Sequence, residues 1–157
     1  MTDRTVANSS CLIILERIGR LELLPAVFGS VLIPEAVAKE IGFSAPWLEV
    51  RAVKDSPLKT RFRNQLGAGE SAALILAIEV APARIVLDDR RARRAAGQLS
   101  LSMIGTPGIL LRAKRRGVLD RVSPIMTAMH KAGFYASKEL VEKTLRLAGE
   151  VGETPNA

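Results

Sequence analysis

Five polar residues stand near the expected ends of strands and helices, and four of them are carboxylates. Asn8 follows a short apolar segment, Asp88 and Asp89 follow another, Glu40 lies in a predicted helix, and Glu70 opens a later one. Carboxylates held near one another repel unless they share a cation, and hard oxygen ligands select Mg²⁺ or Mn²⁺. A divalent metal site is therefore one function that these residues could serve.

Each of these carboxylates also has a purely structural explanation. Glu70 would be stabilised by the helix dipole in the first turn of its helix, and Glu40, beside Lys39 near a helix end, could be a solvent-facing charge. One of Asp88 and Asp89 would cap the helix that follows, and the other could form surface ion pairs with the neighbouring arginines. The residue types alone leave both interpretations open.

The formal net charge of +7 is concentrated between residues 84 and 121, which contain ten basic and three acidic residues. This density favours a polyanionic partner, and arginine suits bidentate contact with phosphate. Because aromatic residues are scarce here, contact with the nucleic-acid backbone is expected rather than base stacking. A solvated helix face is the alternative. The candidate phosphate ligands are Arg90, Arg91, Arg93, Arg94, Arg112, Lys114, Arg115 and Arg116.

Apolar periodicity predicts strands that alternate with helices. Strands are expected at 4–8, 30–34, 83–89 and 101–105, with an edge strand near 47–53; helices are expected at 10–18, 20–28, 34–42, 67–80, 90–99, 106–117, 122–132 and 137–148. This alternation predicts an α/β fold with a parallel sheet of four to five short strands wrapped by helices. Ligands of such sheets bind at the carboxyl ends of the strands. We expect one domain over 1–149 and a disordered tail over 150–157.

Several protein classes are disfavoured by the sequence. The longest apolar runs are interrupted by charge before the roughly 18 residues that a membrane span needs, and the first residues lack the order of a signal peptide, so a cytoplasmic location is expected. A single cysteine, Cys11, excludes an internal disulfide and is expected to be a buried structural thiol. His130 has no partner motif and is expected to be structural or exposed.

An ordered set of segments resembles the PIN-domain family, the small Mg²⁺-dependent nucleases typified by VapC toxins, and more closely a branch of short prokaryotic PIN-like proteins. The resemblance spans about residue 5 to 149 and rests on "NSSCLIILERIGRLELL", "VLIPEAVAKEI", "LGAGESAALILA", "VLDDRRARRAA" and "IGTPGILLRAKRRG". It implies a three-layer α/β/α fold and metal-dependent hydrolysis of RNA. The acidic positions of the family fall here at Asn8, Glu40, Glu70 and Asp88, with the adjacent Asp89 able to substitute.

The first of these positions departs from the family because Asn8 is neutral. An amide oxygen can ligate Mg²⁺, but it brings no negative charge and cannot act as a base. A loss of only about 1–2 kcal/mol of attraction costs roughly tenfold in metal affinity. Three carboxylates remain, enough to hold Mg²⁺ with several waters. Two functions therefore fit these residues: an active ribonuclease, and a catalytically weak or inactive module that binds RNA or a protein.

The resemblance also implies further roles and partners. Ser9 and Ser10 could donate hydrogen bonds to a phosphate or to a metal-bound water, or simply cap their helix, and Thr106 could bind phosphate or act as an N-cap. The partners would be RNA and, for a toxin, a small acidic antitoxin that covers the basic groove. The leucine-rich and isoleucine-rich faces over 10–27 fit either a homodimer or the core. A phosphoacceptor receiver domain would need an acidic pair where Asn8 stands.

Overall fold

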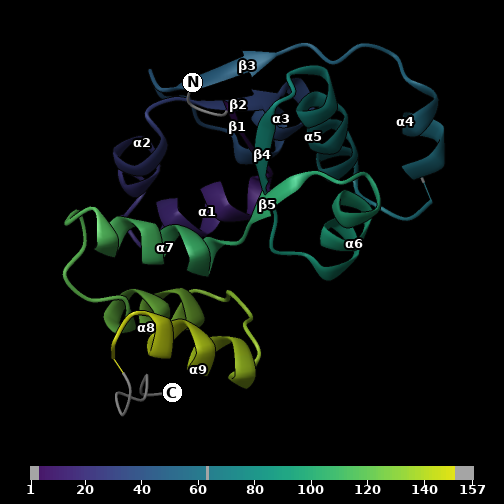
Figure 1. Cartoon of the computed structure of the whole chain (residues 1–157). Coiled ribbons are helices and arrows are strands. Elements are labelled where there is room, and N and C mark those ends of the chain that lie inside the picture. Colours follow the sequence, from purple (N-terminus) through teal and green to yellow (C-terminus); the bar gives the residue numbers. More distant parts are fainter. Residues whose placement is uncertain (1–3, 63, 151–157) are drawn as a thin grey trace.

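The computed structural model describes residues 4–62 and 64–150, and within them the chain forms one parallel sheet (Figure 1). The strand order is β3-β2-β1-β4-β5, and every pairing is parallel. The alternation of strands and helices thus gives the parallel α/β architecture that the sequence predicts. The strands are β1 (Arg4–Ala7), β2 (Val31–Pro34), β3 (Leu48–Arg51), β4 (Ala83–Val86) and β5 (Ser102–Ile104).

Nine helices lie in the described ranges, and one of them was not predicted. The unpredicted helix is α4, in the turn-rich segment after β3, where the Ser56 hydroxyl accepts the backbone N–H of Leu58 at 3.2 Å and Phe62 is buried. No helix of the described residues is long and apolar enough to cross a bilayer. The helices are α1 (Ser9–Arg17), α2 (Leu23–Phe28), α3 (Glu35–Ile41), α4 (Pro57–Phe62), α5 (Ala68–Glu79), α6 (Arg90–Gln98), α7 (Thr106–Arg115), α8 (Ser123–Lys131) and α9 (Lys138–Leu147).

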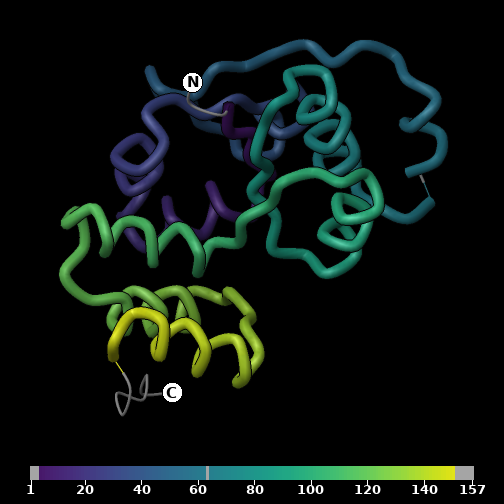
Figure 2. Tube along the Cα trace, viewed as in Figure 1, coloured from purple at the N-terminus to yellow at the C-terminus, as the bar shows by residue number. Residues whose placement is uncertain are grey.

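The central strands are apolar on both faces, and each face has its own core. Successive side chains of a strand point to opposite sides, so Val6 packs with α5 and α6 while Ala7 packs with α1, α2 and α7. Figure 2 shows these helix layers on the two sides of the strands. Strands covered by helices on both faces read as continuous apolar runs. The three-layer α/β/α fold follows from that pattern.

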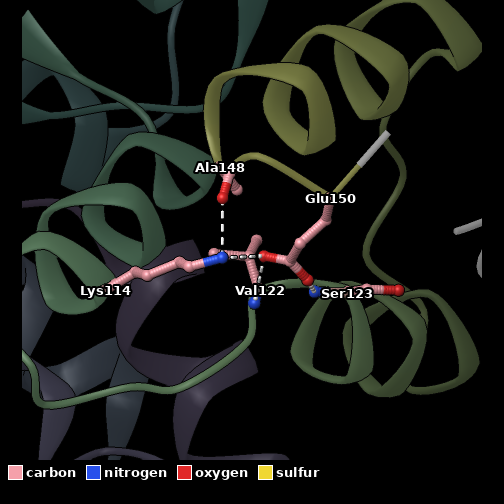
Figure 3. Close-up of polar contacts among 5 residues, drawn as sticks. All are labelled: Lys114, Val122, Ser123, Ala148 and Glu150. Carbon is pink, nitrogen blue, oxygen red and sulfur yellow. Dashed lines mark hydrogen bonds and ion pairs between the residues drawn. The ribbon is translucent and has the colours of Figure 1, made fainter. Parts of the chain in front are cut away.

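The C-terminal helices are fastened to α7 through one buried carboxylate. Glu150 is only 6% exposed; it accepts the backbone N–H groups of Val122 and Ser123 at 2.9 and 3.0 Å and pairs with Lys114 Nζ at 3.0 Å (Figure 3). Lys114 Nζ also donates to the carbonyl of Ala148 at 2.6 Å. The predicted tail, 150–157, therefore began one residue too early, because Glu150 belongs to the fold; residues 151–157 lie outside the described residues.

Cys11 is buried in α1 and is expected to be unreactive in the native protein. Burial raises the pKa of its thiol from 9.0 to about 12, and the nearby Asp88 carboxylate adds to the effect. Since the thiolate is the nucleophile, labelling by a thiol reagent at about pH 8 should be roughly a thousandfold slower than in denaturant. The labelling kinetics measure this ratio, and equal rates in the two conditions would contradict the placement of Cys11.

Candidate active site in the strand-end cleft

The polar strand-end residues meet in one cleft at the carboxyl ends of the central strands. Ala7 of β1 is in register with Val86 of β4, so the residues that follow these two strands emerge side by side. β1 has β2 on its other side, and such a switch in strand order opens a crevice in parallel sheets. We call this feature the strand-end cleft. Its volume is about 1080 Å³, and its lining includes Asn8, Ser9, Ser10, Glu40, Glu70, Asp88, Asp89, Arg90 and Arg93.

Glu40 comes from the end of α3 and is held by two other elements. The Ser9 hydroxyl donates a hydrogen bond to Glu40 Oε2. A Cβ atom added at Gly69 of α5 would lie 2.5 Å from Glu40 Oε1, which no real Cβ contact allows. The carboxylate therefore fits against Gly69 because that residue has no side chain. Glu40 is exposed, but its hydrogen bond with Ser9 and its place in the lining of the cleft distinguish it from an isolated surface charge.

Glu70 is the third residue of α5 and stabilises the start of its own helix. Its Oε1 accepts the backbone N–H of Gly67 at 3.2 Å, so the structural explanation for a carboxylate here holds in part. Burial raises the pKa of Glu70, the Gly67 N–H opposes this, and the carboxylates of Asp89 and Glu40 raise the pKa further. The proximity of these carboxylates is thus unfavourable in the absence of a cation.

Asp88 connects the end of β4 to the start of α7. Its Oδ1 accepts the backbone N–H of Thr106 at 2.8 Å, and its Oδ2 accepts the Thr106 hydroxyl at 2.5 Å. Burial raises the pKa of Asp88, whereas the Thr106 hydrogen bonds and the Arg93 guanidinium lower it. Asp89 supplies the predicted N-cap, since its Oδ2 accepts the N–H of Ala92 at 3.0 Å. Both aspartates line the cleft.

Asn8 is the last extended residue before α1 and is 5% exposed. Its backbone N–H donates to the Val86 carbonyl at 3.4 Å, which fixes it beside the end of β4. It occupies the N-cap position, but its side chain makes no capping hydrogen bond. The expectation that Ser9 or Ser10 caps this helix is therefore wrong. Both serines are helical residues, and the Ser9 hydroxyl is used by Glu40.

The predicted arginine surface is divided by α6 into two parts. Arg90 and Arg93 line the strand-end cleft, and Arg93 Nη1 also donates to the Leu87 carbonyl at 2.8 Å. Arg91 and Arg94 instead line a separate hollow of about 510 Å³, which they share with Arg61 and Gln98. Only Arg90 and Arg93 are thus placed to meet a phosphate in the cleft itself.

The basic residues of 112–116 lie in the second half of α7 and directly after it, roughly 9–15 Å along the helix axis from Thr106. Lys114 is paired with Glu150, and Arg116 Nη1 donates to the Val27 carbonyl, so both side chains already have partners in the protein. Their contact with a phosphate stays a prediction. Burial lowers the pKa of Arg112, and the neighbouring cations Arg84, Arg116 and Arg115 lower it further.

The prediction that Thr106 binds a phosphate is corrected, because this residue is fully buried and both its backbone N–H and its hydroxyl donate to Asp88. The N-cap position of α7 belongs to Gly105 rather than to Thr106. Thr106 thus positions a carboxylate and does not present its amide to a phosphate in the cleft.

The segment between α8 and α9 contributes a side of the cleft that sequence reasoning missed. Phe134, Tyr135 and Ser137 line it together with the acidic residues, as does Leu140 from the first turn of α9. No metal-ligand or phosphate-binding pattern marks this segment. The available signal was two adjacent aromatic residues, in a chain that has few, placed between two predicted helices.

The donors in the cleft fit a hard divalent cation by their chemistry, but they do not enclose one. Within residues 4–62 and 64–150, no three carboxylate, histidine or cysteine side chains come together closely enough to hold a metal ion in this arrangement. Glu40, Glu70 and Asp88 are instead bound to donors of the protein. Mg²⁺ commonly uses only one or two carboxylates, with waters and substrate phosphates completing its coordination.

Comparison with known proteins gives one match. A family model described as a PIN domain matches residues 4–150, which is nearly the whole chain. No curated protein and no solved structure matches the chain.

Proposed function

The chain belongs to the PIN-domain family, a nuclease family, and from this premise we propose that its strand-end cleft hydrolyses RNA phosphodiester bonds with Mg²⁺ or Mn²⁺. One observation carries the proposal. Carboxylates that come from α3, α5 and the end of β4 line the same cleft as Asn8, Arg90 and Arg93. A metal-dependent phosphodiesterase site needs acidic groups that bind the metal ion and basic side chains that bind the phosphate.

The cation would be held by Glu40, Glu70 and Asp88, with Asn8 as a neutral ligand and Asp89 as the substitute for Asp88. The chemistry that a divalent cation supplies when bound is neutralisation of phosphate charge and a lower pKa for the attacking water. Burial is the main cause of the raised pKa of Glu70, and repulsion from Asp89 and Glu40 adds to it. A bound cation would remove that repulsion, which supports this assignment.

The surrounding residues would prepare the cleft for that chemistry. Thr106 orients both oxygens of Asp88, and the Arg93 guanidinium favours the ionised form of this half-buried carboxyl. Ser9 orients Glu40 in the same way. Arg90, which is exposed at the start of α6, would contact the phosphate of the substrate. Such contacts to ligating residues often matter nearly as much as the ligands themselves.

The cellular role that we propose for this activity is that of a toxin in a toxin-antitoxin pair, acting in the cytoplasm. A small acidic antitoxin would cover Arg90 and Arg93 until it is degraded, and the chain could pair as a homodimer. The alternative is a catalytically weak or inactive module that binds RNA or a protein. Asn8 supports this alternative because it removes one negative charge from the cation site.

The decisive experiment compares RNA cleavage and metal binding in one preparation. A labelled single-stranded RNA is incubated with the protein in millimolar Mg²⁺ or Mn²⁺ and in EDTA, and the melting temperature is measured under the same conditions. The nuclease predicts cleavage only with metal and a higher melting temperature with Mn²⁺. RNA binding without cleavage or a metal response would instead support the inactive module.

The variant Asn8→Asp is expected to cleave RNA as fast as the original protein or faster. A carboxylate here restores the charge that Asn8 lacks, and Mn²⁺ affinity should rise by up to roughly tenfold. In EDTA the variant should melt at a lower temperature, since residue 8 is buried and the added charge is unpaired. Melting curves with increasing Mn²⁺ measure both effects.

The matched control is Asn64→Asp, which adds the same charge at an exposed position outside the strand-end cleft. It should leave both Mn²⁺ affinity and cleavage unchanged. Loss of cleavage in Asn8→Asp would mean that residue 8 is not a neutral ligand of the cation.

A further inference from the structure

Tyr135 is exposed to an unusual degree for an aromatic residue that lines a cleft. Its exposed fraction is 85%, against 54% for Leu147, the next most exposed of the large hydrophobic residues in the described ranges. It borders the strand-end cleft together with Asn8, Glu70 and Asp88. A ring left largely in water buries little apolar surface on folding, so its face is available to a ligand of this cleft.

The segment that carries Tyr135 is held by hydrogen bonds on both sides. The Phe134 N–H donates to the Met129 carbonyl at 2.9 Å, and the half-buried Phe134 ring packs against the core. On the other side, the Ser137 hydroxyl caps α9 by accepting the Leu140 N–H at 3.1 Å. Figure 1 shows this connection on the side of the molecule where α6 lies. The ring is therefore presented from a fixed backbone.

The chemistry around Tyr135 restricts the kind of partner. The cleft offers Arg90 and Arg93 for phosphates and carboxylates for a cation, whereas Tyr135 offers a flat apolar face. A nucleotide matches both features, because its charged phosphate can bind the arginines and its flat base can lie against the tyrosine ring. Bases of a duplex already stack on their neighbours, but bases of a single strand are free to stack on an aromatic side chain.

We propose that Tyr135 stacks on a base of single-stranded RNA whose phosphate backbone enters the strand-end cleft. The inference rests on the proposed function and names the substrate class of the same cleft. Because every base has an aromatic face, Tyr135 contributes affinity for unpaired RNA with little preference for sequence. It acts in binding and not in the hydrolysis itself.

Binding measured in EDTA tests the proposal without hydrolysis. Anisotropy of a short fluorescein-labelled RNA gives the dissociation constant for the single strand and for the same strand annealed to its complement. Tyr135→Ala should weaken binding of the single strand by roughly 5- to 150-fold. Tyr135→Phe should stay within about twofold, because the stacking face is kept. Binding of the duplex should not change.

Two controls separate stacking from charge and from general surface effects. Leu147→Ala removes another exposed apolar side chain, on α9 but outside the cleft, and should leave binding unchanged. Arg90→Gln should reduce the slope of log K against log salt by about one, while Tyr135→Ala should leave that slope as it is.

A fluorescent variant reports the contact directly. In Tyr135→Trp, the added indole should be quenched when single-stranded RNA binds, well beyond the response of Trp47, which lies outside the cleft. The stacking proposal is overturned if Tyr135→Ala binds single-stranded RNA as tightly as the original protein does. It is also overturned if this variant loses the same affinity for the single strand and for the duplex. In both cases the nuclease proposal stands. If stacking is found but metal never gives cleavage, only the nuclease proposal fails. Absence of RNA binding overturns both.

Discussion

Replacing Glu70 by glutamine is expected to lower RNA cleavage at least about 100-fold and to abolish the rise in melting temperature with Mn²⁺. Glutamine keeps an oxygen that can accept the Gly67 N–H, so the start of α5 should remain intact. What it removes is the negative charge that lies near Asp89 and Glu40. Single-turnover cleavage rates and melting curves with and without Mn²⁺ measure the two losses.

The matched control is Glu35→Gln, another neutralisation in the first turn of a helix, at an exposed residue outside the strand-end cleft. It should cleave RNA at the rate of the original protein. In EDTA the Glu70→Gln protein should be at least as stable as the original, because it relieves repulsion between carboxylates. Full cleavage by Glu70→Gln would remove Glu70 from the cation site.

Replacing Glu150 by alanine is expected to destabilise the protein by about 2–3 kcal/mol, since two backbone N–H groups and Lys114 lose a charged, buried partner. For a chain of this size the melting temperature should fall by roughly 5–10 °C. Glu142→Ala, at an exposed position of α9, is the control and should change little. A Glu150→Ala protein as stable as this control would show that the carboxylate does not hold the C-terminal helices.

The effect of Glu150 should also depend on pH. Its pKa is lowered from 4.5 by the Ser123 and Val122 N–H groups and by Lys114, which together outweigh its burial. A carboxyl with a lowered folded-state pKa stabilises the protein fully above its unfolded pKa, and the contribution is lost as pH falls through the folded value. The difference in melting temperature between the original protein and Glu150→Ala should therefore be constant near neutral pH and shrink in acid below 4.5.

The fold and the convergence of the acidic residues could be predicted because both follow from local patterns. Runs such as "ARIVL" end at carboxylates, and parallel strands bring their carboxyl ends to one edge of the sheet. Asn8, Glu40, Glu70 and Asp88 were placed near one another by this rule and by the family resemblance, and all four line the cleft. Their roles in metal binding and catalysis stay predictions.

The partners of Lys114 and Thr106 and the position of Tyr135 could not be predicted, because they depend on contacts between residues far apart in the sequence, which no local sequence pattern reveals. The partner of Lys114 is Glu150, which lies 36 positions away, so nothing in the sequence around this lysine indicates that it is paired. Thr106 resembled a helix cap, but its hydroxyl belongs to a carboxylate 18 residues earlier. Tyr135 reaches the cleft only through the packing of α8 and α9. The scarcity of aromatic residues between 84 and 121 argues against base stacking there. Tyr135 lies outside that region, and its stacking on a base stays a proposal.

The contact between Gly69 and Glu40 has a consequence for how this cleft can evolve. Any side chain at position 69 would enter the space of the Glu40 carboxylate, since even a methyl group would lie within 2.9 Å of three of its atoms. A descendant that gains a larger residue there must move or lose the glutamate, and one that loses the glutamate is released from the need for glycine. Because this carboxylate is the exposed end of a flexible side chain, an alanine at 69 is expected to turn it away from Ser9 at little cost to folding, and the two positions are expected to vary together between lineages.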